Sequence, residues 1–587
     1  MAEKKQISLT IDDVVVKVPE GSTIMDAADS IGVAIPRLCY HPHLSILGAC
    51  RVCLVEVEGM RNPVASCAYP AEAGMKVRTS STLLRRLRRD VVELILDNHP
   101  QECQTCERNT NCELQKLSFE LGIRDRLFQG ERKRYKKDLS SPAVTRDLEK
   151  CILCGRCVRV CEEVQGVTNL SQHRRGFHIE VSPAHQGNMM NSVCVQCGQC
   201  ANVCPTAAIV EHNDSEAVFA ALADPAKHVV VQTAPSIRAA IGEGFGYEPG
   251  TPATGRMVTA LRLMGFDKVF DTNFGADLTI VEEAYEFMRR LQNNDRLPLL
   301  TSCSPGWIKF MEHFYPELIP HASTCRSPMM MLSVLLKTYY AEKAGIDPKN
   351  VFVVAIMPCT AKKFEAKRPE HFTPYGVPYT DAVLTTRELI WMMKCYGMDF
   401  RHLQDGEFDN PLGVSTGAAD LFGTTGGVME AALRTAYEKL TGKPCEKLDF
   451  VEVRGVEGVK ESAVKIDGKV INVAVSNGLQ NAKNLLDRVV RREKEYHLIE
   501  VMACTGGCIG GGGQPYPPPG MHIMDASLLK MRAKALYTID SQKKLRKSHE
   551  NPYILKLYEE YLGEPNGHKA HELLHTHYEP KFPRGIR

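Results

Sequence analysis

Residues 151–161 read CILCGRCVRVC, and residues 194–205 read CVQCGQCANVCP. In each run, three cysteines are separated by two residues, and a fourth cysteine follows after three more. This spacing is typical of segments that hold [4Fe-4S] clusters, where the fourth cysteine of each run ligates the cluster of the other run. The two runs therefore predict a unit over residues 141–212 that carries two such clusters.

The expected cross-ligation divides these cysteines into two sets of four. The first set is Cys151, Cys154, Cys157 and Cys204, and the second is Cys194, Cys197, Cys200 and Cys161. Bacterial two-cluster ferredoxins carry the same double run, so we expect a ferredoxin-like fold for residues 141–212. Clusters that only hold the fold are the alternative, but an ordered series of clusters favours electron transfer.

The cysteines are unevenly distributed along the 587 residues. Fifteen of the 22 fall between Cys39 and Cys204, and the other seven between Cys303 and Cys508. The start, MAEKKQISLT, lacks the apolar core of a signal peptide, so we expect a cytoplasmic protein. In a reducing compartment these thiols are expected to be metal ligands and not disulfides.

Composition excludes several classes of partner. The 72 basic and 70 acidic side chains give a formal net charge of +2, which provides no basic footprint for nucleic acid. No run approaches 18 apolar residues, so we expect no membrane span. The length allows several domains and predicts a multidomain α+β and α/β protein.

Residues 1–80 predict a β-grasp domain with a [2Fe-2S] cluster. The segment QISLTIDDVVVKVPEG alternates apolar residues on either side of Asp12 and Asp13, which predicts two strands and a turn. Four cysteines with one two-residue spacing follow: Cys39, Cys50, Cys53 and Cys67. Two bridged iron atoms need four thiolates, and this wide spacing resembles plant-type ferredoxins. A zinc site is the alternative.

Residues 81–140 predict a small helical domain around a second metal site. Helical patterns cover residues 83–97 and 113–128. Between them lie one histidine and three cysteines: His99, Cys103, Cys106 and Cys112. Such a set can hold structural zinc equally well. The position between two electron-carrying units favours a [4Fe-4S] cluster.

Residues 213–545 alternate helical patterns with short apolar strand patterns, which predicts a large α/β domain. Residues 546–587 predict C-terminal helices and a polar tail that belong to this domain. The tail carries a group of closely spaced histidines, His568, His571, His575 and His577. We expect them to be exposed and not to bind metal, because no acidic or thiol partner is suitably spaced.

Three cysteine-bearing segments of the α/β domain each follow a strand pattern. They are TSCSPGW (301–307), MPCTAKKFE (357–365) and EVMACTGGCIGGGGQP (500–515). Cysteines that follow separate strands can bring their thiolates to one point, which predicts a buried cluster. The glycines of the third segment allow the backbone to approach this cluster closely. The remaining cysteines, Cys325, Cys395 and Cys445, are interpreted as structural.

These three segments resemble the signature motifs of [FeFe]-hydrogenases, and the resemblance extends over essentially the whole chain. The order of the N-terminal cluster motifs resembles clostridial-type enzymes and catalytic subunits of multimeric NAD(P)-linked, electron-bifurcating hydrogenases. The resemblance implies reversible interconversion of H2 with protons and electrons at an H-cluster, a [4Fe-4S] cubane joined to a two-iron unit with CO, cyanide and an azadithiolate. It assigns Cys359, Cys504 and Cys508 as cubane ligands.

The first segment departs from the family pattern. Members usually have two adjacent cysteines, the first for proton delivery and the second as cubane ligand, whereas this chain has Cys303 followed by Ser304. A thiolate is a far better ligand for cubane iron than an alkoxide. Three alternatives remain: Ser304 ligates, the cubane has three thiolates, or Cys303 becomes the ligand.

The resemblance also implies a proton path and a set of groups around the two-iron unit. The path comprises Cys303, Glu283, Ser323, Glu286 and Arg290. The surrounding groups are Lys362, Ser236, Pro235, Met357 and Met502, with Met329 where better-known relatives have glutamine. Without the resemblance, the glutamates would be interpreted as the solvated face of an amphipathic helix.

No flavin or nucleotide fingerprint is evident in the chain, because the glycine run of the third segment carries the cluster cysteines. Use of NAD(P)H would therefore require flavin- and NAD(P)-binding partner subunits, and we expect a hetero-oligomer that docks through the [2Fe-2S] domain. A hydrogenase that works alone with ferredoxin is the alternative. A hydrogen sensor and an electron-transfer subunit without H2 chemistry are the less favoured classes.

Overall fold

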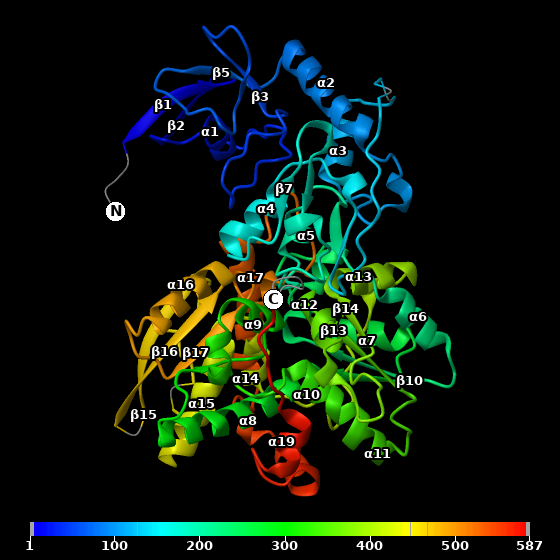
Figure 1. Ribbon diagram of the computed structural model, residues 1–587, viewed down its shortest axis with the longest axis vertical. Coiled ribbons are helices and arrows are strands. Elements are labelled where there is room, and N and C mark those ends of the chain that lie inside the picture. Colours follow the sequence, from blue (N-terminus) through cyan, green and yellow to red (C-terminus); the bar gives the residue numbers. More distant parts are fainter. Residues whose placement is uncertain (1–4, 126, 129, 447, 467, 583–587) are drawn as a thin grey trace.

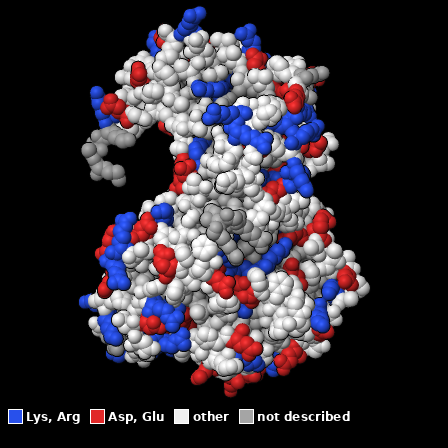
Figure 2. All heavy atoms as spheres, viewed as in Figure 1, with Lys and Arg blue, Asp and Glu red and all other residues white. Residues whose placement is uncertain are grey.

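The computed structural model describes residues 5–125, 127–128, 130–446, 448–466 and 468–582 (Figure 1). The N-terminal third forms a smaller upper part, and the rest of the chain forms the larger lower part (Figure 1). On the face shown in Figure 2, basic and acidic side chains are interspersed over both parts. The division into these parts agrees with the multidomain fold that the sequence predicts.

The alternating residues at the start of the chain form the first hairpin of a five-stranded sheet. Strands β1 (Gln6–Ile11) and β2 (Val14–Pro19) pair antiparallel, and Asp12 and Asp13 between them have φ values of 44° and 65°. Positive φ at both central residues is typical of the two-residue hairpin turns whose backbone twist matches that of the paired strands. The sheet order is β2-β1-β5-β3-β4, with β3 (Leu54–Val57), β4 (Val64–Ala65) and β5 (Lys76–Arg78). Helix α1 (Ile24–Ser30) contributes to its core.

Two helices follow the sheet and flank the second group of cysteines. Helix α2 (Thr82–Asn98) begins after the N-cap Ser81, whose side chain accepts from the Leu84 N–H. Helix α3 (Glu113–Glu120) ends well before residue 128, the end expected from the sequence. Gly122 has φ +67°, a left-handed conformation that commonly ends a helix.

The double cysteine run folds around two short antiparallel sheets. Strand β6 (Val144–Arg146) pairs with β9 (Ile209–Glu211), and β7 (Ser171–His173) pairs with β8 (Glu180–Ser182). Helices α4 (Arg156–Arg159) and α5 (Gln199–Val203) each start after a left-handed glycine, Gly155 or Gly198. The two runs are therefore alike in local structure as well as in spacing.

The lower part is built on two four-stranded sheets. The first has the order β11-β10-β13-β14 and is entirely parallel, with β10 (His228–Thr233), β11 (Lys268–Asp271), β13 (Val351–Met357) and β14 (Ala382–Thr385). The second has the order β12-β17-β16-β15, with β12 (Leu299–Leu300), β15 (Val459–Ile466), β16 (Lys469–Asn477) and β17 (Leu498–Met502). Only its edge strand β15 is antiparallel.

Helices pack on both sheets, while the edge strand β15 stays partly exposed. Along the chain, the helices from just before β10 to just after β14 are α6 (Ser215–Ala223), α7 (Thr254–Leu263), α8 (Thr272–Asn293), α9 (Pro305–Phe314), α10 (Pro328–Leu335), α11 (Ala341–Ala344), α12 (Ala361–Ala366) and α13 (Thr386–Cys395). Later come α14 (Gly417–Asp420), α15 (Gly427–Thr441), α16 (Leu479–Val490), α17 (Ala526–Gln542), α18 (Pro552–Leu557) and α19 (His568–Leu574). This is the α/β architecture expected for the region. In the described ranges no helix is long and apolar enough to cross a membrane.

The C-terminal helices pack back onto the lower part (Figure 1). Helix α18 contacts α8, and α19 contacts α10. On α17, the buried Arg532 forms two hydrogen bonds of 2.8 and 2.7 Å to the Glu243 carboxylate and one of 2.7 Å to the Ile509 carbonyl. Because Ile509 follows Cys508, α17 holds the glycine-rich segment in place.

Replacing Arg532 with Met is expected to lower the free energy of unfolding by ~3–5 kcal/mol, because a buried carboxylate loses its charged partner. Urea denaturation followed by circular dichroism measures this change. Lys530→Met is the control: Lys530 is exposed on the same helix, and its replacement should change stability by less than ~0.5 kcal/mol. Equal stability of the two variants would contradict the proposed role of the ion pair.

Candidate active site

The cysteines of the N-terminal sheet meet in one loop region beside it. The Cys39 thiol is hydrogen-bonded to Cys50 and Cys67, and the Cys53 thiol is hydrogen-bonded to Cys67. These contacts lower the pKa of Cys39. A thiolate is the form that binds iron, so the four sulfurs are positioned to share one metal centre.

The second group converges on a cavity that includes His99, Cys103, Cys106 and Cys112 among its lining residues. Burial lowers the pKa of His99 to about 4, so its imidazole is neutral near pH 7. Its Nδ1 is buried and has no hydrogen-bond partner among the described residues. A neutral ring with a free nitrogen is what a metal ligand requires.

The double run surrounds two further cavities. One is lined by Cys151, Cys154, Cys157 and Cys204, and the other by Cys161, Cys194, Cys197 and Cys200. The structure thus brings together the same two sets of four that cross-ligation requires. Burial raises the pKa of Cys151 and Cys161 to about 11, because a lone thiolate is unfavourable away from water. Bound iron reverses this preference.

A further cavity lies at the carboxyl ends of strands from both sheets of the lower part. It is lined by four cysteines that follow three strands: Cys303 after β12, Cys359 after β13, and Cys504 and Cys508 after β17. Ligands gather at the carboxyl ends of parallel strands because the loops there converge. The remaining lining is largely apolar and includes Pro235, Met329, Met357 and Met502.

Glycines let the third segment approach its neighbours. A Cβ on Gly511 would lie 2.3 Å from the Pro358 carbonyl oxygen, and one on Gly512 would lie 2.2 Å from that of Cys197. Both distances are too short for any side chain. Thr360 also donates to the Gln196 carbonyl at 2.8 Å. The central cavity therefore adjoins the loop that carries the last ferredoxin-type run.

The adjacent Cys303 and Ser304 have different surroundings. Burial and the nearby Glu283 carboxyl raise the pKa of Cys303 well above its usual value. The Ser304 hydroxyl accepts from the Ala503 N–H at 3.3 Å, next to Cys504. Cys504 in turn is hydrogen-bonded to Cys359, which has a lowered pKa for this reason. Ser304 thus lies on the side of the paired cysteines, and Cys303 lies near Glu283.

Two polar groups come from the cavity wall and from beside it: Lys362 lines the cavity, and Ser236 is the neighbour of the lining residue Pro235. Lys362 donates to the Cys303 carbonyl at 3.1 Å and to the Glu365 carboxylate at 2.7 Å. Ser236 follows Pro235, and its hydroxyl is buried with no hydrogen-bond partner in the described part of the chain. An ammonium group and an unpaired hydroxyl suit a bound group with anionic acceptors.

The glutamates of α8 are buried and do not form a solvated face, so that alternative interpretation is wrong. Glu283, Glu286 and Arg290 are 3, 1 and 5% exposed. Arg290 donates to Glu286 at 2.6 Å, and the Ser323 hydroxyl donates to the same carboxylate at 2.9 Å. Ser323 also lies close enough to Glu283 to lower the pKa of its carboxyl, against the larger effect of burial. The side chains form a continuous buried series behind Cys303.

Sequence comparison matches five segments to known families. Residues 227–512 match "Iron only hydrogenase large subunit, C-terminal domain", and residues 526–581 match "Iron hydrogenase small subunit". The N-terminal matches are a 2Fe-2S iron-sulfur cluster binding domain (4–82), the NADH-ubiquinone oxidoreductase-G iron-sulfur binding region (88–126) and a 4Fe-4S dicluster domain (150–208).

Two full-length relatives decide the family. The chain is 50% identical over 584 residues to the NADP-reducing hydrogenase subunit HndD of Solidesulfovibrio fructosivorans, covering 97% of this chain and 98% of that protein. It is 40% identical over 573 residues to iron hydrogenase 1 of Clostridium pasteurianum, covering 97% and 99%. The chain belongs to the iron-only hydrogenase family.

A solved structure of the catalytic part agrees with this assignment. An apo form of the [FeFe]-hydrogenase HydA1 from Chlamydomonas reinhardtii has a TM-score of 0.56 and 46% identity, covering 62% of this chain and 98% of that one. The hydrogenase is an oxidoreductase acting on H2. It has binding domains for [2Fe-2S] and [4Fe-4S] clusters and for an H-cluster.

Sequence reasoning missed Glu500 of this hydrogenase. It lies on β17 and accepts from the backbone N–H groups of Gly426 and Met429 at 2.6 and 2.7 Å. Burial raises its pKa to about 7. The available signal was a single carboxylate within the apolar strand sequence LIEVM.

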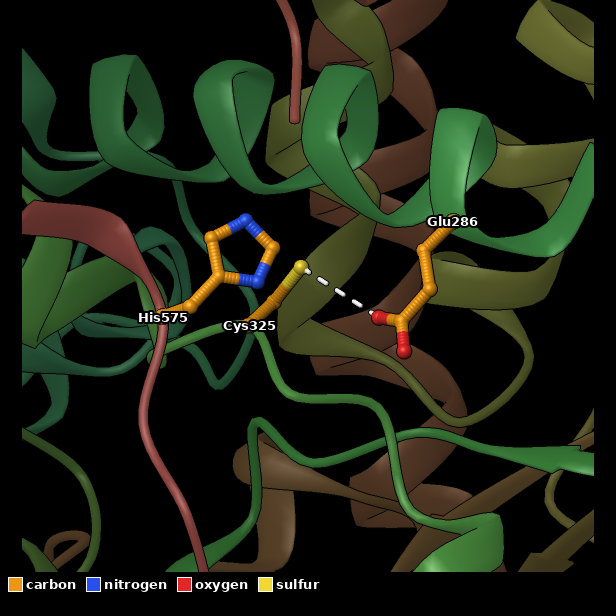
Figure 3. A group of neighbouring side chains, drawn as sticks. All are labelled: Glu286, Cys325 and His575. Atoms are coloured by element: carbon orange, nitrogen blue, oxygen red, sulfur yellow. Dashed lines mark hydrogen bonds between the residues drawn. The ribbon is translucent and has the colours of Figure 1, made fainter. Parts of the chain in front are cut away.

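The exposure expected for His575 is wrong. His575 is 6% exposed, its Nε2 lies 3.0 Å from Glu282 Oε2, and it lies close to Cys325 and Glu286 (Figure 3). It therefore has both an acidic and a thiol neighbour. These partners come from α8 and from a loop about 250 residues earlier in the chain, so spacing within the tail could not indicate them. The exposure expected for His568, His571 and His577 is observed.

Burial and the neighbouring Glu286 raise the pKa of Glu283 to about 8. We therefore expect Glu283 to be protonated at pH 7 and to lose its proton as the pH rises through about 8. Infrared difference spectra should show a buried carboxylic-acid band that disappears between pH 7 and 9. The stability from this raised pKa is present below the usual glutamate pKa and is lost as the pH rises through the folded value.

Glu283→Gln should remove this band, whereas Glu317→Gln, at an exposed position, should leave it unchanged. A band that persists in Glu283→Gln would belong to another carboxyl group and would contradict the assignment.

Proposed function

We propose that this hydrogenase is the catalytic subunit of a cytoplasmic, multimeric NADP(H)-linked enzyme that interconverts H2 with protons and electrons. The observation that carries the proposal is the buried cavity lined by Cys303, Cys359, Cys504 and Cys508, which adjoins the Cys197 loop. The NADP link is supported by 50% identity, over nearly the whole chain, to a protein named as a subunit of an NADP-reducing hydrogenase.

The cluster ligands follow the sets proposed from the sequence. Cys39, Cys50, Cys53 and Cys67 would hold a [2Fe-2S] cluster, and His99, Cys103, Cys106 and Cys112 a [4Fe-4S] cluster. Two further [4Fe-4S] clusters would use Cys151, Cys154, Cys157 and Cys204, and Cys161, Cys194, Cys197 and Cys200. The H-cluster cubane would use Cys359, Cys504 and Cys508, with Ser304 at the fourth position.

Short contacts between these sites support their role in electron transfer. Arg159 donates to the carbonyls of Cys39 and Cys154 at 2.7 and 3.3 Å, which connects the first site to the third. The N–H of Glu113, next to Cys112, donates to the Pro205 carbonyl at 3.0 Å, which connects the second site to the same unit. Both N-terminal sites would thus pass electrons to the ferredoxin-like unit and on to the central cavity.

The domain limits that we propose are residues 1–80, 81–140, 141–212, 213–545 and 546–587. The third encloses two of the metal-binding constellations, and the first, second and fourth enclose one each. The last belongs to the catalytic part, because its helices α18 and α19 pack on α8 and α10. The match of residues 526–581 to a small-subunit family suggests that this segment functions as a unit with α17.

The chain's own groups would move protons between the cavity and the surface. Cys303 would exchange a proton with the bound cofactor, and Glu283, with its raised pKa, would take it up and release it near neutral pH. Ser323 would relay it to Glu286, which Arg290 holds at 2.6 Å. When bound, the H-cluster supplies the reversible cleavage of H2.

Five side chains would bind and orient the cofactor. Lys362 and Ser236 would donate hydrogen bonds to anionic acceptors of the two-iron unit, while Pro235, Met357 and Met502 would exclude water. Low polarity around such a site strengthens those hydrogen bonds and tunes its potential. A buried position for Met329 adds to this apolar wall.

The proposed complex predicts where NADP(H) chemistry takes place. Purification of the tagged chain from its source should recover flavin- and NADP-binding subunits, and the complex should reduce NADP+ with H2. The isolated, matured chain should show CO and cyanide infrared bands and reduce an artificial dye with H2, but not reduce NADP+.

Reduction of NADP+ by the isolated chain would contradict the need for a separate flavoprotein subunit. Absence of the infrared bands after full maturation would contradict the hydrogenase function. A complex that accepts only ferredoxin would favour the alternative partner.

Ser304→Cys tests the fourth cubane position. A thiolate there should bind iron more tightly than the serine oxygen, so release of active-site iron to a chelator should slow at least about tenfold. Ser302→Cys is the control, because the neighbouring Ser302 hydroxyl donates to the Cys325 carbonyl and lies outside the cavity lining. Loss of cubane iron in Cys303→Ala would instead identify Cys303 as the ligand.

A further inference from the structure

Three potential metal ligands meet beside the proposed proton path, on its side toward the C-terminal helices. Glu286 comes from α8, Cys325 from the loop before α10, and His575 from the end of α19 (Figure 3). One ligand atom from each lies within 4.8 Å of the other two, and the thiol sulfur lies 3.8 Å from the Glu286 oxygen. All three residues are buried.

These distances are close to those of a zinc site. Bond lengths of ~2.3 Å to sulfur and ~2.0–2.2 Å to nitrogen or oxygen, in a tetrahedron, put ligand atoms roughly 3.3–3.7 Å apart. The observed separations, all within 4.8 Å, need to shorten by about 1.5 Å at most. Thiolate, imidazole and carboxylate are also the donors that Zn2+ prefers.

The histidine is already oriented as a ligand. Its Nε2 lies 3.0 Å from the Glu282 carboxylate, which can only accept, so Nε2 carries the proton. Its Nδ1 therefore has the lone pair. Nδ1 lies toward Cys325 in Figure 3 and accepts from the Thr324 hydroxyl at 2.8 Å, a hydrogen bond that Zn2+ would replace. A carboxylate that fixes the far nitrogen of a ligating histidine is a recurring feature of zinc sites.

The carboxylates are held in position independently of any metal. The Tyr558 hydroxyl and the Asn566 N–H donate to Glu282, and Arg290 and Ser323 donate to Glu286. A site whose ligands are fixed by other contacts loses little conformational freedom on binding.

We propose that Glu286, Cys325 and His575 form a Zn2+ site, and that Zn2+ bound there stops proton transfer through Glu286 and inhibits the hydrogenase. The inhibition rests on the proposed function of Glu286 in the proton path. On binding, the Cys325 thiol releases one proton to solvent and becomes a thiolate ligand. The two positive charges of Zn2+ then balance the Cys325 thiolate and the Glu282 carboxylate. The Glu286 carboxylate is already paired with Arg290.

A route for the ion leads from the surface. His571 is exposed, and its ring stacks on that of His575 with centroids 4.0 Å apart. It can take up the ion before the buried ligands do. Burial and the carboxylates of α8 raise the pKa of Cys325 well above its usual value, so without metal this cysteine is a neutral thiol.

The test uses the matured holoenzyme, whose cluster cysteines are occupied by iron, and Zn2+ as the probe. After equilibrium dialysis, wild type should retain one more zinc per chain than Cys325→Ala or His575→Gln. Zinc-edge X-ray absorption should show one sulfur at ~2.3 Å and lighter ligands at ~2.0–2.2 Å. Cys395→Ala, which removes an exposed cysteine, is the matched control and should bind zinc like wild type.

Activity gives the second readout. Zn2+ should lower H2 production by wild type and by Cys395→Ala at least tenfold, reversibly with chelator, and should leave Cys325→Ala and His575→Gln active. Equal zinc content in all variants would overturn the site. Zinc bound through Cys325 without inhibition would overturn the blocking role and would also contradict proton transfer through Glu286. Activity of the zinc-free enzyme tests the hydrogenase function separately.

Discussion

The approach of the glycine-rich segment to its neighbours is the constraint on which the rest of the molecule depends. Gly512 lies so close to the Cys197 carbonyl, and Gly511 to that of Pro358, that no side chain could be accommodated at either position. This close contact joins the loop of a ferredoxin-type unit to the loops at the ends of β13 and β17. The rate of electron transfer falls steeply with distance. A short path between the cluster sites therefore requires glycine at both positions, where no side chain keeps the loops apart. Arg532 then holds the segment from behind by its bond to Ile509.

A second constraint is the burial of charge along α8. Burying a carboxylate is costly unless it is protonated or paired, and α8 shows both solutions. Glu286 is paired with Arg290, whereas Glu283 has a pKa raised to about 8. The first arrangement keeps a charge in place, and the second provides a group that exchanges protons near neutral pH. The same need for partners explains why Glu282 binds His575 and Tyr558 of the C-terminal segment.

Much of the fold and site could be predicted from short segments. The turn at Asp12 and Asp13, the glycine before each short helix of the double run, and the strand before each signature segment all depend on local chemistry. The helix expected to reach residue 128 ends at Glu120 instead, because Gly122 adopts a left-handed conformation there. Glu500 and His575 could not be predicted, because their roles come from partners distant in the sequence.

The sequence by itself predicted the ligand sets of the accessory sites, indicated the family and showed serine at position 304. Most of these ligand sets contain cysteines separated by two residues, and such spacings are visible in the order of residues. Only the tertiary structure decided that the α8 glutamates are buried, that Cys303 and Ser304 have different surroundings, and that Cys325 and His575 meet Glu286. Those facts depend on which distant segments pack together, and burial, which sets charge and proton affinity, exists only once they have packed.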